Sequence, residues 1–416
     1  MPERIVLHIG ATKTGTSAIQ SALARNRDRL LTQGALYPEG LQEDKAQAGR
    51  VTSGNGHIFR RFRKTYEEAA GLACQEFEAA LQNTIATRAD ADTVLFSNEA
   101  LGGLNQEALA DLQKIFARYF RVVRLVYYVR HLADHAVSQY GEYIKRRKMK
   151  MPFERFTEKK YRAPFKKAMA TVESVFSPTE IDYVLYDDVR RDLYRDFLRR
   201  LQISSDGHLS PNTVNRSFTY DELEVLREVN SLGLPKSLLA RIAEDYAFRN
   251  EPPRQIALPV SRSAIDFVGA RNRDVIEFAN ERLGSSQLRV ASDELMAKAC
   301  NDPELGEPEL DRNIVVRILE SGQRVMKERE VAFGERVKAK RRKLKSPDEA
   351  ATPLVRRPLE DRLQAVLARA REMACASNGL LSDTRKVLLE GMLLIRDCDL
   401  INRGYVPETP EGATVD

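Results

Sequence analysis

Short apolar runs alternate with helix-like segments through the first half of this chain. Five runs have the length and the branched or aromatic residues of buried strands: 4–9, 35–38, 93–97, 122–129 and 181–186. Apolar residues recur at helical spacing in other stretches: 16–34, 65–86, 105–119, 132–148 and 190–201. Strands that alternate with helices build βαβ units, in which right-handed crossovers join parallel strands. The sequence therefore predicts an α/β fold with a parallel sheet flanked by helices.

Beyond Leu201 the chain is predicted to be helical. Helical spacing recurs at 220–232, 237–248, 272–283 and, in a long charged segment, 310–345. Two amphipathic segments, 359–376 and 380–400, flank Asn378-Gly379 as an αα-hairpin would. We expect an α/β domain, a charged helical segment, a linker rich in proline, and a helical hairpin with a tail, at 1–290, 291–345, 346–358 and 359–416. This α-helical C-terminal extension needs an apolar partner, so it either forms a homodimer contact or braces the long helix.

Composition limits the class of protein. The 416 residues are 43% apolar and 30% charged, as in a soluble globular protein, and no apolar run reaches the ~18 residues of a membrane span. The N-terminal segment lacks the basic flank and cleavage site of a signal peptide. Four cysteines without a Cys-x-x-Cys pair predict no metal site, no disulfide framework and a cytoplasmic location. A net charge of +6 suits an anionic ligand, but nucleic acid is not an expected partner.

The most informative segment, Leu7-His-Ile-Gly-Ala-Thr-Lys-Thr-Gly-Thr-Ser17, lies between the first strand and the first helix. Ligands of parallel sheets bind outside the carboxyl ends of the strands. Gly10 and Gly15 let the backbone curl around an anion, toward which its N–H groups and the positive end of the helix dipole converge. Lys13 adds a charge, and hydroxyl donors follow at Thr14, Thr16 and Ser17. The segment predicts a phosphate-binding loop, with an ordinary strand–helix turn as the alternative.

The loop differs from a Walker A motif. That motif ends in Gly-Lys-Ser/Thr, whereas Lys13 precedes Gly15 here. The lysine ammonium would therefore meet a bound phosphate chain at another point. Nothing in the loop requires a metal ion.

A second anion-binding pair follows the run 122–129. Arg130 comes directly after this predicted strand, and Ser138 lies one to two turns into the next helix. A guanidinium fork and a hydroxyl can together grip a terminal phosphate. The alternative is an arginine in a surface ion pair.

Together these segments resemble the P-loop-type fold of sulfotransferases that use 3′-phosphoadenosine 5′-phosphosulfate (PAPS). The loop 9–17 is similar to that family's loop for the 5′-phosphosulfate, which implies binding roles for Gly10, Thr12, Lys13, Thr14, Gly15, Thr16 and Ser17. Arg130 and Ser138 are similar to its 3′-phosphate grip. The resemblance covers about residues 4–285 and is strongest to the bacterial branch, through 34–38, 215–217 and 272–284. Thr12 and His131 stand where the family commonly has proline, and the change at Thr12 could loosen the loop.

The resemblance implies sulfuryl transfer by in-line displacement to a hydroxyl or amine of a carbohydrate or small metabolite. Lys13 and the loop amides would stabilise the charge on the leaving oxygen, with no obligatory metal. Two residues are candidates for the general base: Glu99, which follows the strand 93–97, and His57, in a glycine-containing loop that could fold over the site. The alternatives are a carboxylate at a helix N-terminus for Glu99 and an exposed loop imidazole for His57.

Three further features are left open by the sequence. His8 alternates with apolar strand residues, which favours a packed histidine or a donor that stabilises the loop. The acids of 186–188 either border the nucleotide or cap the next helix. The basic stretch 145–167 is either an electropositive rim for an anionic ligand or, slightly favoured, a solvated helix surface.

Two other functions remain as alternatives. A nucleotide-dependent kinase would share the sheet and the loop, but it should carry Gly-Lys-Ser/Thr, which is absent. A non-catalytic binder of glycans or nucleic acid would use the basic stretch 145–167 and bind in a strongly salt-dependent way.

Overall fold

The computed structural model describes residues 2–40, 55–88, 90–209, 217–250, 258–301, 310–343, 352–375 and 381–402. The chain divides into two compact units. The first unit comprises 1–139, 153–216 and 260–302, and the second comprises 140–152, 217–259 and 303–416. The units interleave along the sequence, and the boundaries expected at 290, 345 and 358 stay predictions.

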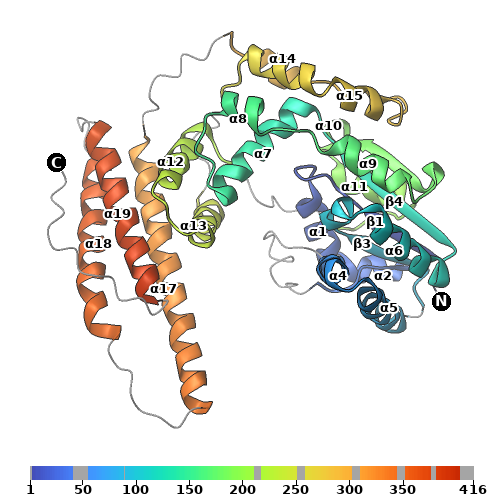
Figure 1. The fold of residues 1–416 in the computed structure, drawn as a ribbon, viewed down its shortest axis with the longest axis horizontal. Helices are drawn as coiled ribbons and strands as arrows, with labels where there is room; N and C mark the ends of the chain where they lie inside the picture. Colours follow the sequence, from blue (N-terminus) through green and yellow to red (C-terminus); the bar gives the residue numbers. More distant parts are fainter. Residues whose placement is uncertain are drawn as a thin grey trace. The chain divides into compact units, whose positions relative to one another are not determined.

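The first unit contains the predicted parallel sheet (Figure 1). Its strands are β1 (Arg4–His8), β2 (Ala35–Leu36), β3 (Thr93–Ser97), β4 (Val122–Val129) and β5 (Ile181–Leu185). They lie in the order β2-β3-β1-β4-β5, and every neighbouring pair is parallel. The α/β fold class with a parallel sheet, flanking helices and C-terminal helices is thus confirmed.

Helices of the first unit connect and cover these strands. They are α1 (Thr16–Arg25), α2 (Arg27–Thr32), α4 (His57–Glu68), α5 (Ala70–Ala86), η1 (Glu99–Gly103), α6 (Gln106–Tyr119), α8 (Phe153–Lys159), α9 (Phe165–Glu173), η2 (Pro178–Glu180), α10 (Tyr186–Val189), α11 (Leu193–Arg200), α14 (Arg262–Arg271), α15 (Arg273–Asn280) and α16 (Asp293–Lys298). Helix α7 (Leu132–Arg147) begins in the first unit and ends in the second.

The single helix predicted over 16–34 is wrong, because Asn26 divides it. The Asn26 side chain donates to the carbonyls of Ala22 at 2.8 Å and Leu209 at 3.0 Å, and it accepts from the Leu209 N–H at 2.6 Å. An asparagine that satisfies a distant main chain in this way interrupts the helix locally. The sequence could not show the contact, since its partner lies far along the chain.

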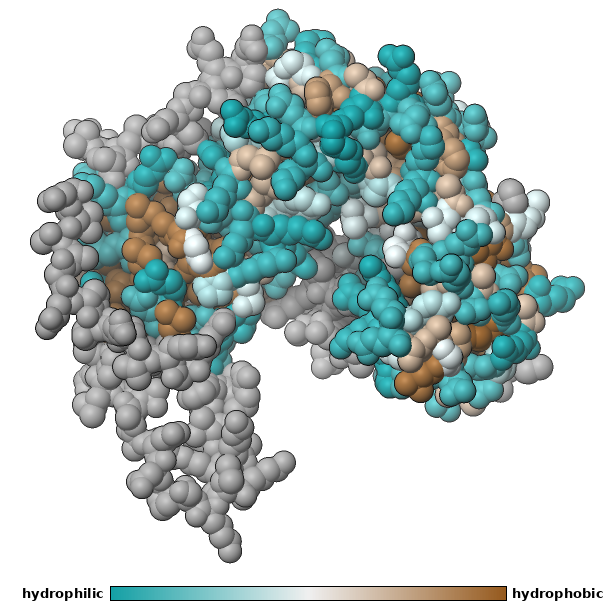
Figure 2. Space-filling view, in the orientation of Figure 1, coloured by the Kyte–Doolittle hydropathy of each residue, from teal (hydrophilic) through white to brown (hydrophobic). Residues whose placement is uncertain are grey.

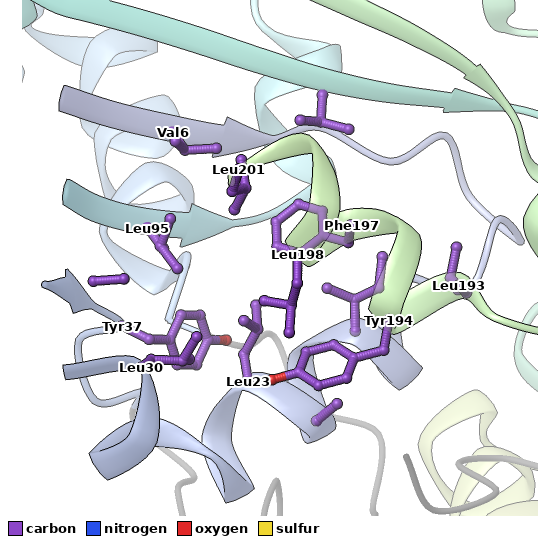
Figure 3. Packing of buried hydrophobic residues seen from close by; sticks show 14 of the residues in the cluster. Val6, Leu23, Leu30, Tyr37, Leu95, Leu193, Tyr194, Phe197, Leu198 and Leu201 are labelled. Atoms are coloured by element: carbon purple, nitrogen blue, oxygen red, sulfur yellow. The ribbon is translucent and has the colours of Figure 1, made fainter. Parts of the chain in front are cut away.

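Apolar residues from the strands and from α1, α2 and α11 form one core of the first unit. Figure 3 shows Val6 and Leu95 of the sheet facing Leu23 of α1 and the α11 residues Phe197 and Leu198. These side chains are at most 1% exposed. This packing fixes α1 against the sheet and so fixes the loop that precedes α1.

The second unit is helical. It contains α12 (Tyr220–Ser231), α13 (Lys236–Arg249), α17 (Arg312–Lys343), α18 (Thr352–Cys375) and α19 (Leu381–Asn402). Helices α18 and α19 pack against each other and against α17, so the hairpin braces the long helix, one of the two alternatives expected. Figure 2 shows an apolar area over these C-terminal helices, and the homodimer stays a prediction.

Helix α18 begins inside the segment 346–358 that was expected to be a linker. Pro353 is its second residue, where the missing N–H has no intrahelical partner in any case. The rest of that segment up to 351, and the Asn378-Gly379 turn, lie outside the described residues. Among the described residues, no helix has the length and apolar character that a bilayer crossing needs.

Candidate functional site

The strand order places three loops at one edge of the sheet. From the central strand β1 the chain crosses the sheet toward β2. From β3 and from β4, the two strands beside β1, it crosses in the opposite direction, toward β5. Right-handed crossovers then put the helix after β1 on the other face from those after β3 and β4. Ligands of parallel sheets bind at such a switch point, outside the carboxyl ends of the strands. The segments after His8, Ser97 and Val129 therefore form the candidate site.

The loop after β1 continues along β4 before it turns. The N–H of Ile9 donates to the Val126 carbonyl at 2.9 Å, and the N–H of Ala11 donates to the Tyr128 carbonyl at 3.4 Å. Lys13 then adopts a left-handed conformation with φ of 68°, which is uncommon outside glycine. Such a conformation persists only where the surroundings enforce it, and it is concentrated at functional sites.

The structure explains why residues 10 and 15 of the loop are glycines. Gly15 has φ of +78° and is the residue directly before α1, and a Cβ there would approach Tyr186 to 3.0 Å. A Cβ at Gly10 would lie 3.2 Å from Thr14 Oγ1, 3.4 Å from His8 Nε2 and within 3.0 Å of Thr16 Oγ1. The loop is therefore as tight as a backbone cradle for an anion requires.

The hydroxyl of Thr14 is used within the loop itself. Thr14 donates its hydroxyl to the Ala11 carbonyl at 2.6 Å, and Thr16 Oγ1 is buried beneath the loop. The Thr14 hydroxyl thus stabilises the turn from inside, whereas Thr16 Oγ1 has no hydrogen-bond partner among the described residues. Both residues can also reach an anion through main-chain N–H groups. The first turn of α1 supplies such N–H groups at Thr16 and Ser17, while the exposed Thr12 lies 3.4 Å from His135 Nε2.

His8 is a packed histidine, as predicted. It is fully buried, its Nδ1 lies 2.8 Å from Ser97 Oγ, and its ring contacts Tyr128 edge-on. Burial lowers the pKa of His8 to about 3, so the ring is neutral at physiological pH. His8 thus joins the ends of β1 and β3 beneath the loop and carries no charge to a ligand.

The structure brings Arg130 and Ser138 together and joins them to the loop. Arg130 Nη1 donates to Ser138 Oγ at 2.7 Å and to the Lys13 carbonyl at 3.2 Å. The second bond holds the left-handed turn of the loop. Ser138 Oγ accepts from Arg130 and keeps its own proton for another acceptor. The two anion-binding elements predicted from the sequence are therefore in direct contact.

Asp187, which follows β5, borders the same guanidinium. Its Oδ2 accepts from the His131 N–H at 2.8 Å, and its Oδ1 lies 3.6 Å from Arg130 Nε. Burial raises the pKa of Asp187, because removal from water disfavours the carboxylate. The sequence left the role of this acid open between bordering the nucleotide and capping a helix. The structure shows a contact with Arg130 and His131.

The side chain of His131, the residue after Arg130, is itself used in hydrogen bonding. Its Nδ1 accepts from the N–H of Arg289 at 3.1 Å. The carbonyls of Arg289 and Val290 accept in turn from the first N–H groups of α7, at Leu132 and Ala133. Burial lowers the pKa of His131, which keeps the ring neutral and able to accept. The segment 288–292 thereby fixes the start of the helix that carries Ser138.

The two candidate bases lie after β3 or beside it. Glu99 is exposed and begins η1, directly after the strand. His57 is not in a loop as expected but is the first residue of α4. Burial lowers the pKa of His57, and its buried Nδ1 has no hydrogen-bond partner among the described residues. Residues 41–54 lie outside the described part of the chain.

Asn55 explains why α4 begins there. Strand β2 pairs β3 only at Thr93 and Val94, so β3 has an edge beyond that point. The Asn55 amide donates to the Leu95 carbonyl at 2.7 Å and accepts from the Ser97 N–H at 3.0 Å. One side chain thus replaces a neighbouring strand, which brings His57 to the carboxyl end of β3.

The basic stretch 145–167 is partly neutralised by its own surroundings. Arg146 pairs with Glu142 and Glu244, Lys145 lies over the Phe218 ring at 4.7 Å, and Lys166 pairs with Asp274. These contacts favour the alternative of an ordinary helix surface. No group of three or more metal-ligating side chains lies within the ranges that the structure describes.

Comparison with known proteins adds little to this geometry. No family model matches the chain, and no curated protein matches it. Among solved structures, it is similar to a sulfotransferase domain from the curacin biosynthetic pathway, at 11% identity and a TM-score of 0.29, over 50% of this chain and 76% of that one. A likeness this weak carries no argument, so the functional argument rests on the residues of the site. The segment 215–216, part of the bacterial resemblance, lies outside the described residues.

Proposed function

We propose that this chain is a sulfotransferase that uses PAPS as the donor and a carbohydrate or small metabolite as the acceptor. One observation carries the proposal: Arg130 contacts both the turn of the phosphate loop, at the Lys13 carbonyl, and Ser138. PAPS carries its 5′-phosphosulfate and its 3′-phosphate on one ribose, so it needs two anion sites that lie this close.

The residues of the site fit such a donor. The loop from Gly10 to Ser17 would hold the 5′-phosphosulfate through Lys13 and the N–H groups at the start of α1. The 3′-phosphate would accept from Ser138 Oγ and from Arg130 Nη2, which makes no hydrogen bond to another residue in the described ranges.

Each step of the transfer then has a protein group in place. The donor supplies an activated sulfuryl group: the acceptor oxygen bonds to sulfur as the sulfur–oxygen bond to the phosphate breaks, which leaves adenosine 3′,5′-bisphosphate. Lys13 and the loop amides stabilise the negative charge that forms on that phosphate oxygen. A base removes the acceptor proton, and His57, kept neutral by burial, and Glu99 are the two proposed bases.

Calorimetry with adenosine 3′,5′-bisphosphate and with ATP tests the proposal. We expect the bisphosphate to bind and ATP not to bind. The Lys13→Ala variant should lose about tenfold or more in affinity, since a charge-assisted bond contributes about 1.5–3 kcal/mol. Lys114→Ala, which removes an exposed lysine paired with Asp111, is the matched control and should bind normally.

The other outcomes identify the alternatives. Tight binding of ATP alone would favour a kinase. Salt-dependent binding of a polyanion, insensitive to Lys13→Ala and without sulfate transfer, would favour a non-catalytic binder.

A further inference from the structure

The carboxylate of Asp187 and the guanidinium of Arg130 face each other in a buried position. Their side chains are 7% and 17% exposed, and Asp187 Oδ1 lies 3.6 Å from Arg130 Nε. Neither of these two atoms has a hydrogen-bond partner within the described chain. The two groups therefore interact as a pair of opposite charges without a hydrogen bond, in surroundings where solvent screens little.

The other contacts of Arg130 show what this pairing achieves. Nη1 is engaged by Ser138 Oγ and the Lys13 carbonyl, and the Tyr186 ring lies 5.2 Å from the guanidinium carbon. Since Nη1 is engaged and Nε lies beside Asp187, Nη2 is the nitrogen left for a ligand. The plane of the guanidinium is thus determined by residues that follow β1, β4 and β5.

We propose that Asp187 is a positioning residue that orients Arg130 and thereby sets the preference for a nucleotide with a 3′-phosphate. The inference rests on the proposed function and deepens it. An arginine has several rotatable bonds, and freezing them on binding opposes affinity. A carboxylate that holds the guanidinium beforehand removes much of that cost. Asp187 is itself held, because its Oδ2 accepts from the His131 N–H at 2.8 Å.

A competing effect has the opposite sign. The negative charge of Asp187 repels a phosphate and competes for the same guanidinium. If competition dominated, removing the charge would strengthen binding of a 3′-phosphate. The sign of the change therefore separates orientation from competition.

The experiment compares adenosine 3′,5′-bisphosphate with adenosine 5′-monophosphate, by calorimetry on the full chain. The ratio of the two dissociation constants measures the contribution of the 3′-phosphate. Asp187→Asn keeps an acceptor for His131 and removes the charge. We expect it to weaken bisphosphate binding by about tenfold and to change monophosphate binding less than about twofold, since one charge-assisted contact is disturbed.

Asp188→Asn is the matched control. Asp188 is the adjacent, exposed carboxylate, and it accepts from Ser286 Oγ at 2.7 Å. The Asp188→Asn variant should leave the ratio of the two dissociation constants unchanged. In an Arg130→Met background, Asp187→Asn should have no further effect on the ratio, because the group it orients is gone. Asp187→Ser is a second neutral variant should Asp187→Asn not fold.

Three results would overturn the inference: an unchanged ratio, tighter binding of the bisphosphate, or equal weakening of both nucleotides, which would indicate a merely structural role. Failure of the proposed function looks different. There, the unaltered chain itself would not prefer the bisphosphate over the monophosphate.

Discussion

Replacing Gly56 by alanine puts a methyl group where the structure has no room for one. A Cβ at this position would lie within 3.0 Å of the Cβ, Cγ and Nδ2 atoms of Asn98. Asn98 cannot yield easily, because it is 1% exposed and its N–H donates to the His8 carbonyl at 3.0 Å. The segment before α4 must therefore move away from the end of β3.

The cost follows from what this movement breaks. Overpacking of this kind costs about 1–3 kcal/mol. If the segment lifts, Asn55 also loses its bonds to Leu95 and Ser97, and each buried group left unpaired adds about 1 kcal/mol or more. We expect Gly56→Ala to lower the free energy of unfolding of the first unit by about 3–5 kcal/mol.

Gly71→Ala is the control, and its effect should have the opposite sign. Gly71 is helical, and a Cβ there would meet nothing within 4 Å. Alanine should therefore stabilise by about 0.4–1 kcal/mol. Urea unfolding followed by circular dichroism measures both variants. Equal stability of the Gly56→Ala variant and the unaltered chain would refute the placement of α4 against β3.

Two further predictions concern buried ionisable side chains. Burial lowers the pKa of both His8 and His135 to about 3, so the unfolded chain takes up their protons first and stability falls as the pH drops from about 6.5 toward 3. Urea unfolding between about pH 6 and 4 should show a slope smaller by about 1.4 kcal/mol per pH unit in His135→Gln, and an unchanged slope would contradict this assignment. Asp399→Ala should destabilise the second unit by about 3–5 kcal/mol, because it leaves the charge of Arg329 unpaired in a largely buried place. Glu390→Ala, in an exposed ion pair, should cost less than about 1 kcal/mol in the same assay, and equal losses would count against the buried pair.

The strands at the centre of the sheet were predictable because their own residues determine them. The runs 93–97 and 122–129 were predicted with the bounds observed, since a buried parallel strand is apolar on both faces. The loop from Gly10 to Ser17 and the pair Arg130–Ser138 were likewise visible as residue types at strand ends. Their mutual contact follows from the position of β4 beside β1, which no local pattern encodes.

The features of the site that the sequence did not predict depend on contacts made in the folded chain. His57 was expected in a loop, but α4 begins at this residue because Asn55 pairs with β3, about 40 residues later. Thr14 was expected to offer its hydroxyl to a ligand, but the tight turn directs that hydroxyl to the Ala11 carbonyl. The signal for Asp187 was present, an acid just after a strand, but only the fold shows that it faces Arg130.

Asn55 has a chemical consequence for the lifetime of the chain. It precedes Gly56, and an asparagine before glycine readily deamidates, because the unhindered glycine nitrogen can attack the side-chain carbonyl and close a succinimide. The folded chain opposes this reaction, since Asn55 is 1% exposed and both ends of its amide are engaged by β3. Deamidation during unfolding would place a carboxylate against the Leu95 carbonyl, so that two acceptors face each other where a donor is required. Each unfolding event would thus risk a permanent change at Asn55, which pairs with the edge of β3, and peptide mapping after incubation in denaturant should find it there.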